Sequence, residues 1–257
     1  MGGVVDIHLH IQPYRAMRPD LLAAMERDQV ANLGLLRRIE RDPKVLLDHL
    51  DAVGVDRAGL INYVAPDVIG YTRAVNDFVA EYQKSDPRRL IAFGSVHPKY
   101  TKDVARETKR LLGSLKLQGI KLHPPHQLFY ANDYATGRYP GLRTLYAICQ
   151  DSGIPVMVHT GTSVFPAARS KFGDPIQVDD VAVDFPDLPI ILAHGGRPLW
   201  CDAAFFLVRR HRNVYMDISS IPPSRLLGYF PRLEDIADKV LFGSDWPGPA
   251  SQESRRT

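Results

Sequence analysis

Two histidines follow an apolar run near the N-terminus, in the segment Val4-Val-Asp-Ile-His-Leu-His10. The β-branched run predicts a short buried strand, and side chains two residues apart leave a strand on the same face. His8 and His10 therefore point the same way, and two neutral imidazoles on one face are half of a transition-metal site. Because the chain contains nine histidines, such a pair can arise by chance. The metal hypothesis therefore depends on further ligands at the ends of later strands.

The chain repeats a short apolar segment, a polar cluster and an amphipathic segment. The apolar segments predict strands over residues 4–8, 58–63, 90–96, 119–123, 155–159, 190–194, 214–217 and 240–243. Strands that alternate with helices predict a parallel sheet with helices outside it, and eight such units close into a barrel. A length of 257 residues fits one such domain, since these barrels have about 250 residues. We therefore expect one α/β domain over residues 1–257, a (β/α)8 TIM barrel.

Two regions depart from the regular barrel pattern. Residues 11–42 follow the first strand and are far longer than a usual connection of about 2–6 residues, so we expect this insertion to lie over the barrel mouth. After the last predicted strand and its Ser-Asp cluster, residues 247–257 remain. This stretch is too short for a barrel helix, so the sequence predicts a shortened C-terminus that lacks the final helix.

Ionisable side chains stand where the later strands end. In barrels of this kind, catalytic groups lie at the C-terminal ends of the strands, so these ends meet at one mouth. The side chains concerned are Lys121, His123, His159, His194 and Asp245. Their convergence supports the metal hypothesis, which a single pair of histidines could not support alone.

The motifs at these strand ends resemble those of the amidohydrolase superfamily. They are Asp6-Ile-His-Leu-His10, Gly119-Ile-Lys-Leu-His123, Pro155-Val-Met-Val-His159, Leu192-Ala-His-Gly-Gly196 and Phe242-Gly-Ser-Asp-Trp-Pro247. The resemblance is strongest to the amidohydrolase-related branch (family 2), which also contains the aminocarboxymuconate-semialdehyde and hydroxybenzoate-type decarboxylases. It implies a distorted barrel with a divalent metal held by four ligands, which are His8, His10, His159 and Asp245. It also implies that His194 lies beside the catalytic water or the substrate.

Three imidazoles and one carboxylate suit a catalytic ion, because they leave a coordination position open to water. A divalent cation lowers the pKa of such a water to around 7. Asp245 can then act both as a ligand and as the acceptor of the water's proton, while His194 polarises the attacked oxygen or transfers a proton. We expect one divalent ion per chain, zinc in the first place, with manganese, iron or cobalt as alternatives.

The remaining candidates are expected to bind substrate. A Lys121 ammonium can bind a substrate carboxylate; the alternative, known from some members of the superfamily, is a carboxylated lysine that bridges two metals. His123 either touches substrate or makes a hydrogen bond at the rim. Arg169 follows the fifth strand, and Arg197 and Trp200 follow the sixth. Fixed cations beside aromatic side chains suit a planar or cyclic organic acid.

Two reactions fit this set of residues. The first, which we favour, is hydrolysis of an amide, ester or lactone of a small cyclic organic acid by an activated water. The second is metal-dependent, non-oxidative decarboxylation of an aromatic or unsaturated acid. A non-catalytic barrel is a third class, and the complete ligand set argues against it.

The composition argues against other partners and locations. The net charge of +3 arises from charges of both signs without a basic tract, so neither nucleic acid nor a membrane surface is an expected partner. No apolar run approaches the roughly 18 residues of a membrane span. Two cysteines, Cys149 and Cys201, and no signal peptide predict a reduced, cytoplasmic protein. We expect a small-molecule substrate, and an uncovered seam at the last strand leaves a homo-oligomer open.

Overall fold

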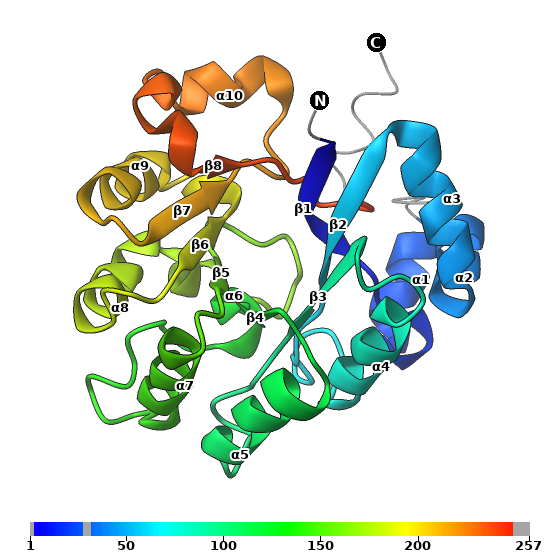
Figure 1. Ribbon diagram of the computed structural model, residues 1–257, viewed down its shortest axis with the longest axis horizontal. Helices are drawn as coiled ribbons and strands as arrows, with labels where there is room; N and C mark the ends of the chain where they lie inside the picture. The colour runs from blue at the N-terminus through cyan, green and yellow to red at the C-terminus, as the bar shows by residue number, and fades with distance from the viewer. Residues whose placement is uncertain (1–2, 28–31, 249–257) are drawn as a thin grey trace.

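Eight parallel strands form a barrel in the computed structural model, which describes residues 3–27 and 32–248 (Figure 1). The strands follow one another around the barrel in sequence order. They are β1 (Val4–His10), β2 (Val55–Ile61), β3 (Leu90–Gly94), β4 (Gly119–Leu122), β5 (Val156–His159), β6 (Ile190–Ala193), β7 (Val214–Asp217) and β8 (Val240–Leu241). The TIM barrel predicted from the sequence is confirmed.

Main-chain hydrogen bonds close the barrel between β1 and the segment that follows β8. The His10 N–H donates to the Trp246 carbonyl at 2.8 Å. In the opposite direction, the Asp245 N–H donates to the His8 carbonyl at 2.8 Å. The backbone therefore fixes Asp245 beside both histidines of β1.

Helices connect the strands and surround the barrel (Figure 1). They are α1 (Pro19–Arg27), α2 (Leu33–Arg41), α3 (Pro43–Val53), α4 (Ala74–Gln83), α5 (Val104–Lys109), α6 (Pro124–Gln127), α7 (Gly141–Asp151), α8 (Val178–Asp184), α9 (Cys201–Arg210) and α10 (Pro223–Tyr229). The 3₁₀-helical segments are η1 (Tyr14–Ala16), η3 (Ser170–Gly173), η4 (Pro175–Gln177), η5 (His194–Gly196) and η6 (Leu233–Lys239), and η2 (Arg110–Ser114) is π-helical.

Strand pairing and capping explain where several elements begin and end. β1 continues to His10, two residues beyond the predicted end, because Leu9 and His10 pair with β2. Helix α3 begins at an N-cap, where the Asp42 side chain accepts the main-chain N–H of Lys44. It ends at Gly54, whose φ of 73° is a left-handed conformation that glycine adopts without a steric penalty.

Side chains alternate between two apolar layers along each strand, because the side-chain period of a strand is two. Ile120 and Leu122 of β4 belong to the layer between the barrel and its helices. Phe93 and Met157 belong to the layer inside the barrel. Lys121 lies between the two outward-facing residues of β4 and therefore faces the barrel interior. The same alternation aims the polar strand ends at a common mouth.

An apolar cluster joins the insertion 11–42 to the loops at the mouth. Tyr14, Met17 and Leu36 pack with side chains of the loop after β2, such as Tyr63. Phe165, in the loop after β5, packs against the same cluster. The insertion is thus attached to the mouth loops, and its action as a lid stays a prediction.

The predicted absence of a final helix concerns residues 247–257, most of which lie outside the described residues. Within the described ranges, no helix is both long and apolar enough to cross a membrane.

Candidate metal centre

Three of the predicted ligands converge where β1 ends and the chain leaves β8. The His10 Nε2 atom lies 3.0 Å from Asp245 Oδ1, and the His8 Nε2 atom lies 3.6 Å from the same oxygen. One ligand atom from each residue lies within 4.8 Å of the others. Since Zn–N and Zn–O bonds are about 2.0–2.2 Å long, only small side-chain shifts are needed to place one ion among them. The structure brings His8, His10 and Asp245 together as predicted.

The other ring nitrogen of His10 is already occupied. Its Nδ1 atom lies 3.2 Å from the carbonyl oxygen of Ile61, which can only accept a hydrogen bond. The Ile61 carbonyl thus orients the ring so that its Nε2 atom lies on the side of Asp245, where a ligand nitrogen is needed.

Three non-glycine residues around the mouth have left-handed backbone conformations. Their φ values are 66° at His194, 57° at Ser220 and 58° at Asp245. Such conformations cost roughly 1–3 kcal/mol each and persist where surrounding contacts enforce them, often at functional sites. Here the Ser220 hydroxyl donates to Asp245 Oδ2. Two of these residues therefore support one another, and the remaining carboxylate oxygen faces the histidines.

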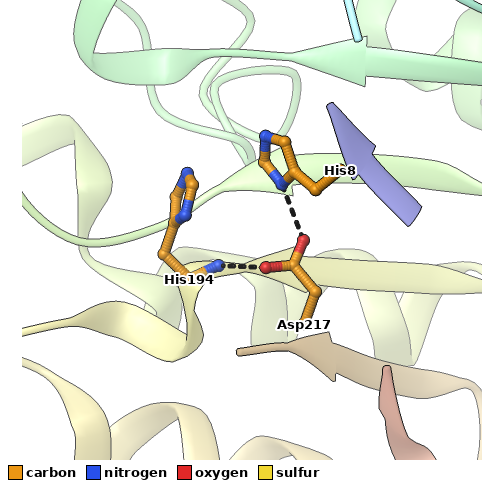
Figure 2. A group of neighbouring side chains, drawn as sticks. All are labelled: His8, His194 and Asp217. Carbon is orange, nitrogen blue, oxygen red and sulfur yellow. Dashed lines mark hydrogen bonds and ion pairs between the residues drawn. The ribbon is translucent and has the colours of Figure 1, made fainter. Parts of the chain in front are cut away.

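Asp217, a buried carboxylate at the end of β7, was missed by the reasoning from sequence. Its Oδ2 atom lies 2.8 Å from His8 Nδ1, and its Oδ1 atom accepts the main-chain N–H of His194 at 2.9 Å (Figure 2). Ser219 was missed as well, and its Oγ atom lies 2.8 Å from His194 Nδ1. A signal for Asp217 was present, because it ends the predicted strand 214–217 in the way that His159 ends its own.

Lys121 lies deep among the ligands rather than at the rim of the mouth. Its side chain is fully buried, and its Nζ atom lies 3.4 Å from His8 Nε2. Burial lowers the pKa of Lys121 to about 8, although the charges of Asp217 and Asp245 partly oppose that shift. Its role, as a cation for a substrate carboxylate or as a carboxylated ligand, stays a prediction.

His123, His126 and His159 form a stack on the β4–β5 side of the mouth. The ring centroid of His123 lies 3.6 Å from that of His126 and 3.8 Å from that of His159. The His159 Nε2 atom lies 3.4 Å from the Thr162 carbonyl, and among the described residues His159 is outside the groups of converging ligand atoms. Its ring nevertheless meets the His194 ring edge-on at 4.6 Å. His159 borders the site, and its role as the fourth ligand stays a prediction.

The three remaining substrate candidates lie in different surroundings. Arg197 and Trp200 belong to the turn after β6, and the Arg197 carbonyl accepts the Thr162 N–H at 3.1 Å, which joins this turn to the loop after β5. The Arg197 Nε atom is buried without a hydrogen-bond partner in the described structure. Arg169 is exposed, and its guanidinium donates to two carbonyls of its own loop. The structure therefore does not bring Arg169 to the ligand group.

The protonation states of the site suit a divalent cation. Burial lowers the pKa of His8 and of His194, so both rings are neutral at pH 7. Burial raises the pKa of Asp245, but its contacts with His194, His10 and His8 lower it overall. Neutral imidazoles beside an ionised carboxylate are the states that bind a metal ion. The donor set at the mouth therefore fits one divalent metal.

Three solved structures show the same fold at low sequence identity. An uncharacterised TIM-barrel protein of Bordetella bronchiseptica is 22% identical, with a TM-score of 0.73 over 98% of this chain and 89% of that chain. A dihydroxybenzoic acid decarboxylase of Polaromonas, with bound manganese and the inhibitor 2-nitroresorcinol, is 19% identical, with a TM-score of 0.65 over 96% and 87%. A probable 2-pyrone-4,6-dicarboxylic acid hydrolase of Acinetobacter baumannii is 15% identical, with a TM-score of 0.64 over 98% and 87%.

A protein-family model described as Amidohydrolase matches residues 5–257. No curated protein matches the chain. The family match covers nearly the whole chain and includes all the residues that converge at the mouth. The chain therefore belongs to the amidohydrolase family of enzymes.

Proposed function

We propose that this enzyme is a metal-dependent hydrolase that activates a water for attack on an amide, ester or lactone of a small cyclic organic acid. The observation that carries the proposal is the convergence of His8, His10 and Asp245 beside the neutral ring of His194. When bound there, a divalent ion supplies Lewis acidity and lowers the pKa of water. We propose zinc because nitrogen-rich sets of this size suit it, with manganese as the alternative that the Polaromonas structure supports.

Asp245 and His194 are the proposed catalytic residues. Asp245 directs Oδ1 at the two histidines of β1 and receives the Ser220 hydroxyl on Oδ2. Each carboxylate oxygen has two lone pairs, so Asp245 can also accept a proton from an attacking water. The neutral His194 ring lies 4.7 Å from the His8 ring, close enough to take up or return a proton at the reacting atoms.

Two cations near the mouth support an acidic substrate. Lys121 lies within the ligand group, and Arg197 lies on the turn after β6, with its Nε atom buried and without a hydrogen-bond partner in the described part of the chain. A planar carboxylate matches the fork geometry of an arginine. The named activities of the Polaromonas and Acinetobacter structures also concern cyclic acids.

The second candidate is a metal-dependent decarboxylase of an aromatic or unsaturated acid. The specific observation in its favour is the shared fold with the manganese-containing dihydroxybenzoic acid decarboxylase. In that reaction, Lys121 and Arg197 would anchor the acid, and His194 would take up a proton from solvent on Nε2 and deliver it to the carbon that loses carbon dioxide.

The two reactions differ in their products, because only hydrolysis incorporates oxygen from water and only decarboxylation releases carbon dioxide. Lactones, esters and amides of cyclic acids should be tested against hydroxybenzoates, with incorporation of oxygen from labelled water and release of carbon dioxide followed in parallel. Labelled oxygen in the product supports the hydrolase, and carbon dioxide without labelled oxygen supports the decarboxylase.

The variant His194→Asn should lower either activity by at least about 100-fold, as is usual for loss of a general acid or base. The matched variant is His211→Asn, which should keep the activity, because His211 follows α9 and its ring contacts Asp179 of α8.

We also propose that the protein is cytoplasmic and that it forms a homo-oligomer. Cys149 and Cys201 are both free thiols in the structure, which supports a reducing, cytoplasmic location. Val4, Val5 and Phe242 are 48%, 39% and 51% exposed where β1 meets the end of β8. Apolar side chains gathered there support a homo-oligomer, which light scattering on the purified protein would test.

A further inference from the structure

Asp217 receives hydrogen bonds from two parts of the candidate site at once. Its Oδ2 atom faces His8 Nδ1 at 2.8 Å. Its Oδ1 atom accepts the main-chain N–H groups of His194 at 2.9 Å and Ser219 at 3.0 Å, together with the Ser219 hydroxyl. Figure 2 shows one Asp217 oxygen facing the ring of His8 and the other facing the main-chain nitrogen of His194. The carboxylate is fully buried, so protein groups take the place of water around it.

Counting protons along these bonds assigns the tautomer of both histidines. A carboxylate only accepts, so the His8 proton must lie on Nδ1. The single hydroxyl proton of Ser219 points to Asp217, so Ser219 Oγ can only accept from His194 Nδ1 at 2.8 Å. His194 therefore also carries its proton on Nδ1. Both Nε2 atoms are left with lone pairs on the side away from Asp217.

We propose that Asp217 is a positioning residue that sets the tautomer of His8 directly and, through the Ser219 hydroxyl, holds the ring of His194 in place. Each ring is thereby held with a bare Nε2 toward the mouth, where His8 can bind the ion and His194 can accept a proton. Carboxylates that hold metal-binding histidines in this way typically change metal affinity by about 10–100-fold when removed. The inference rests on the proposed function for its meaning, but the tautomers themselves can be measured without any substrate.

Asp217 could instead be a ligand, since ligand atoms of His8, His194 and Asp217 lie within 4.8 Å of one another. The hydrogen bonds argue against that. The His8 Nδ1 proton points at Asp217 Oδ2 and the His194 Nδ1 proton points at Ser219 Oγ, so neither nitrogen offers a lone pair to an ion beside Asp217. Two main-chain N–H groups also occupy Oδ1. Asp217 therefore orients ligands and does not compete with Asp245 for the ion.

The variant Asp217→Asn gives this proposal a directional test. The N–H groups of His194 and Ser219 require an acceptor at the Oδ1 position, so they force the amide oxygen of the new side chain to lie there. The amide nitrogen then faces His8 Nδ1 and donates to it. The His8 proton must move to Nε2, while the arrangement at His194 is preserved. This substitution hardly changes the shape of the side chain, yet it should move the proton of His8 from Nδ1 to Nε2 and leave the tautomer of His194 unchanged.

The variant Ser219→Ala tests the second branch. It removes the hydroxyl beside His194, but the main-chain carbonyl of position 219 still lies 3.3 Å from His194 Nδ1. His194 should keep its tautomer with a looser ring. His8 loses a 3.2 Å contact from Nδ1 to the Ser219 hydroxyl but keeps its 2.8 Å contact with Asp217, so its tautomer should also be kept. Asp6→Asn is the matched control, because Asp6 is a buried carboxylate whose Oδ1 accepts the main-chain N–H groups of His8 and Ser244. It should leave both ring tautomers unchanged.

The measurement is a two-bond ¹H–¹⁵N spectrum of the full chain with labelled histidines, without metal and with zinc alone. Zinc affinity is measured alongside it by competition with a chelator. In the wild type we expect the ring protons of His8 and His194 on Nδ1. In Asp217→Asn the His8 proton should lie on Nε2, and zinc should bind at least about 10-fold more weakly. In Asp6→Asn the tautomers and the zinc affinity should change little. A wild-type His8 with its proton on Nε2 overturns the proposal, even if Asp217→Asn does not fold. An Asp217→Asn variant that loses activity while both histidines keep their wild-type tautomers would also overturn it. A wild type with the expected tautomers but without hydrolysis would contradict only the proposed function.

Discussion

The two sides of the barrel mouth hold their histidines in different ways. On the β1–β7–β8 side, His8 and His10 each contact a carboxylate, from Asp217 and Asp245 respectively. On the β4–β5 side, the stack of His123, His126 and His159 is held by ring contacts, hydroxyls and carbonyls. We call these the carboxylate side and the stacked side.

The difference separates a preorganised half of the site from an adaptable half. Asp217 orients His8 and the Ile61 carbonyl orients His10 before an ion arrives, so the carboxylate side needs little rearrangement to bind one. On the stacked side, burial lowers the pKa of His123 and His159, and neighbouring histidine charges lower it further. The His123 Nδ1 atom is buried without a partner in the described structure. His159 would have to turn its Nε2 atom from the Thr162 carbonyl to join the ion.

The largest expected effect comes from removing a ligand on the carboxylate side. His10→Ala should reduce the metal content from about one ion per chain to near zero, because it leaves two of three converging ligands. Turnover should fall by at least about 1,000-fold, in line with the loss of water activation by a metal. Elemental analysis of the purified protein and activity assays measure the two effects.

Variants on the stacked side provide the comparison. His126→Phe keeps an aromatic ring in the stack and should retain the metal. His159→Ala should lower the metal content, but by less than His10→Ala, because His159 does not yet point at the other ligands. Equal losses in all three variants would show that the two sides do not differ. Two ions per chain in the wild type would favour Lys121 as a carboxylated ligand.

Acid should weaken the metal-free protein through its buried histidines, among them those of the stacked side. Burial lowers the pKa of His126 from 6.5 to about 3 in the folded state. The unfolded chain then binds more protons than the folded chain below pH 6.5, so stability is full above that pH and is lost as the pH falls. Between pH 7.5 and pH 5 the loss is about 2 kcal/mol for each histidine that stays neutral when folded. Urea unfolding of the metal-free protein at these two pH values measures it.

The variant His126→Phe sharpens this test. It removes one site of proton uptake, so the difference between the two pH values should shrink by about 2 kcal/mol. His97→Asn should have a similar effect, because burial lowers the pKa of His97 to about 4 at the end of β3. If the difference in unfolding free energy between the two pH values does not shrink in either variant, these rings take up protons without unfolding of the protein.

A smaller effect is expected from crowding the carboxylate side. A Cβ atom at Gly243 would lie 2.8 Å from the His8 Cβ and 3.1 Å from the Ser219 Cβ. Gly243→Ala should therefore destabilise the protein by about 1–3 kcal/mol and weaken zinc binding by moving His8. Gly228→Ala in α10 is the matched control, because a Cβ there meets nothing within 4 Å and alanine favours helices by about 1 kcal/mol. Urea unfolding of both variants measures the contrast, and equal stabilities would contradict the close packing at Gly243.

The carboxylate side was predictable where topology alone sets the position. Parallel strands of a barrel bring their C-terminal ends to one mouth, so the strand-end motifs predicted that His8, His10 and Asp245 would meet. The extension of β1 to His10 was not predictable, because it depends on pairing with β2. Asp217 shares the strand-end pattern, but its partner His8 is 209 positions away in the sequence. Nothing local distinguishes such an aspartate from one that only ends a strand.

The stacked side was predictable only in outline. The sequence placed His123 and His159 at the ends of neighbouring strands, and the structure brings their rings into contact. Ring orientation depends on packing with His126 and on the Thr162 carbonyl, which a strand pattern does not encode. Arg169 shows the same limit, because its loop was placed near the mouth but its side chain turns back on that loop.

The smallest expected effect concerns the insertion 11–42, which connects the two sides. Its Gln12 side chain lies 3.4 Å from His10 Nδ1, and its apolar cluster includes Phe165 of the loop that follows β5. A substrate analogue that contacts both sides should therefore stabilise the insertion and slow its digestion by trypsin, by about 2- to 5-fold if the gain is of order 0.5–1 kcal/mol. Cleavage after Arg15, whose side chain is 78% exposed, should be followed by mass spectrometry. Cleavage after Arg232, between α10 and β8, is the internal control and should keep its rate. If saturating analogue leaves both rates unchanged, the insertion is not a lid, and the two sides of the mouth are joined only through the barrel.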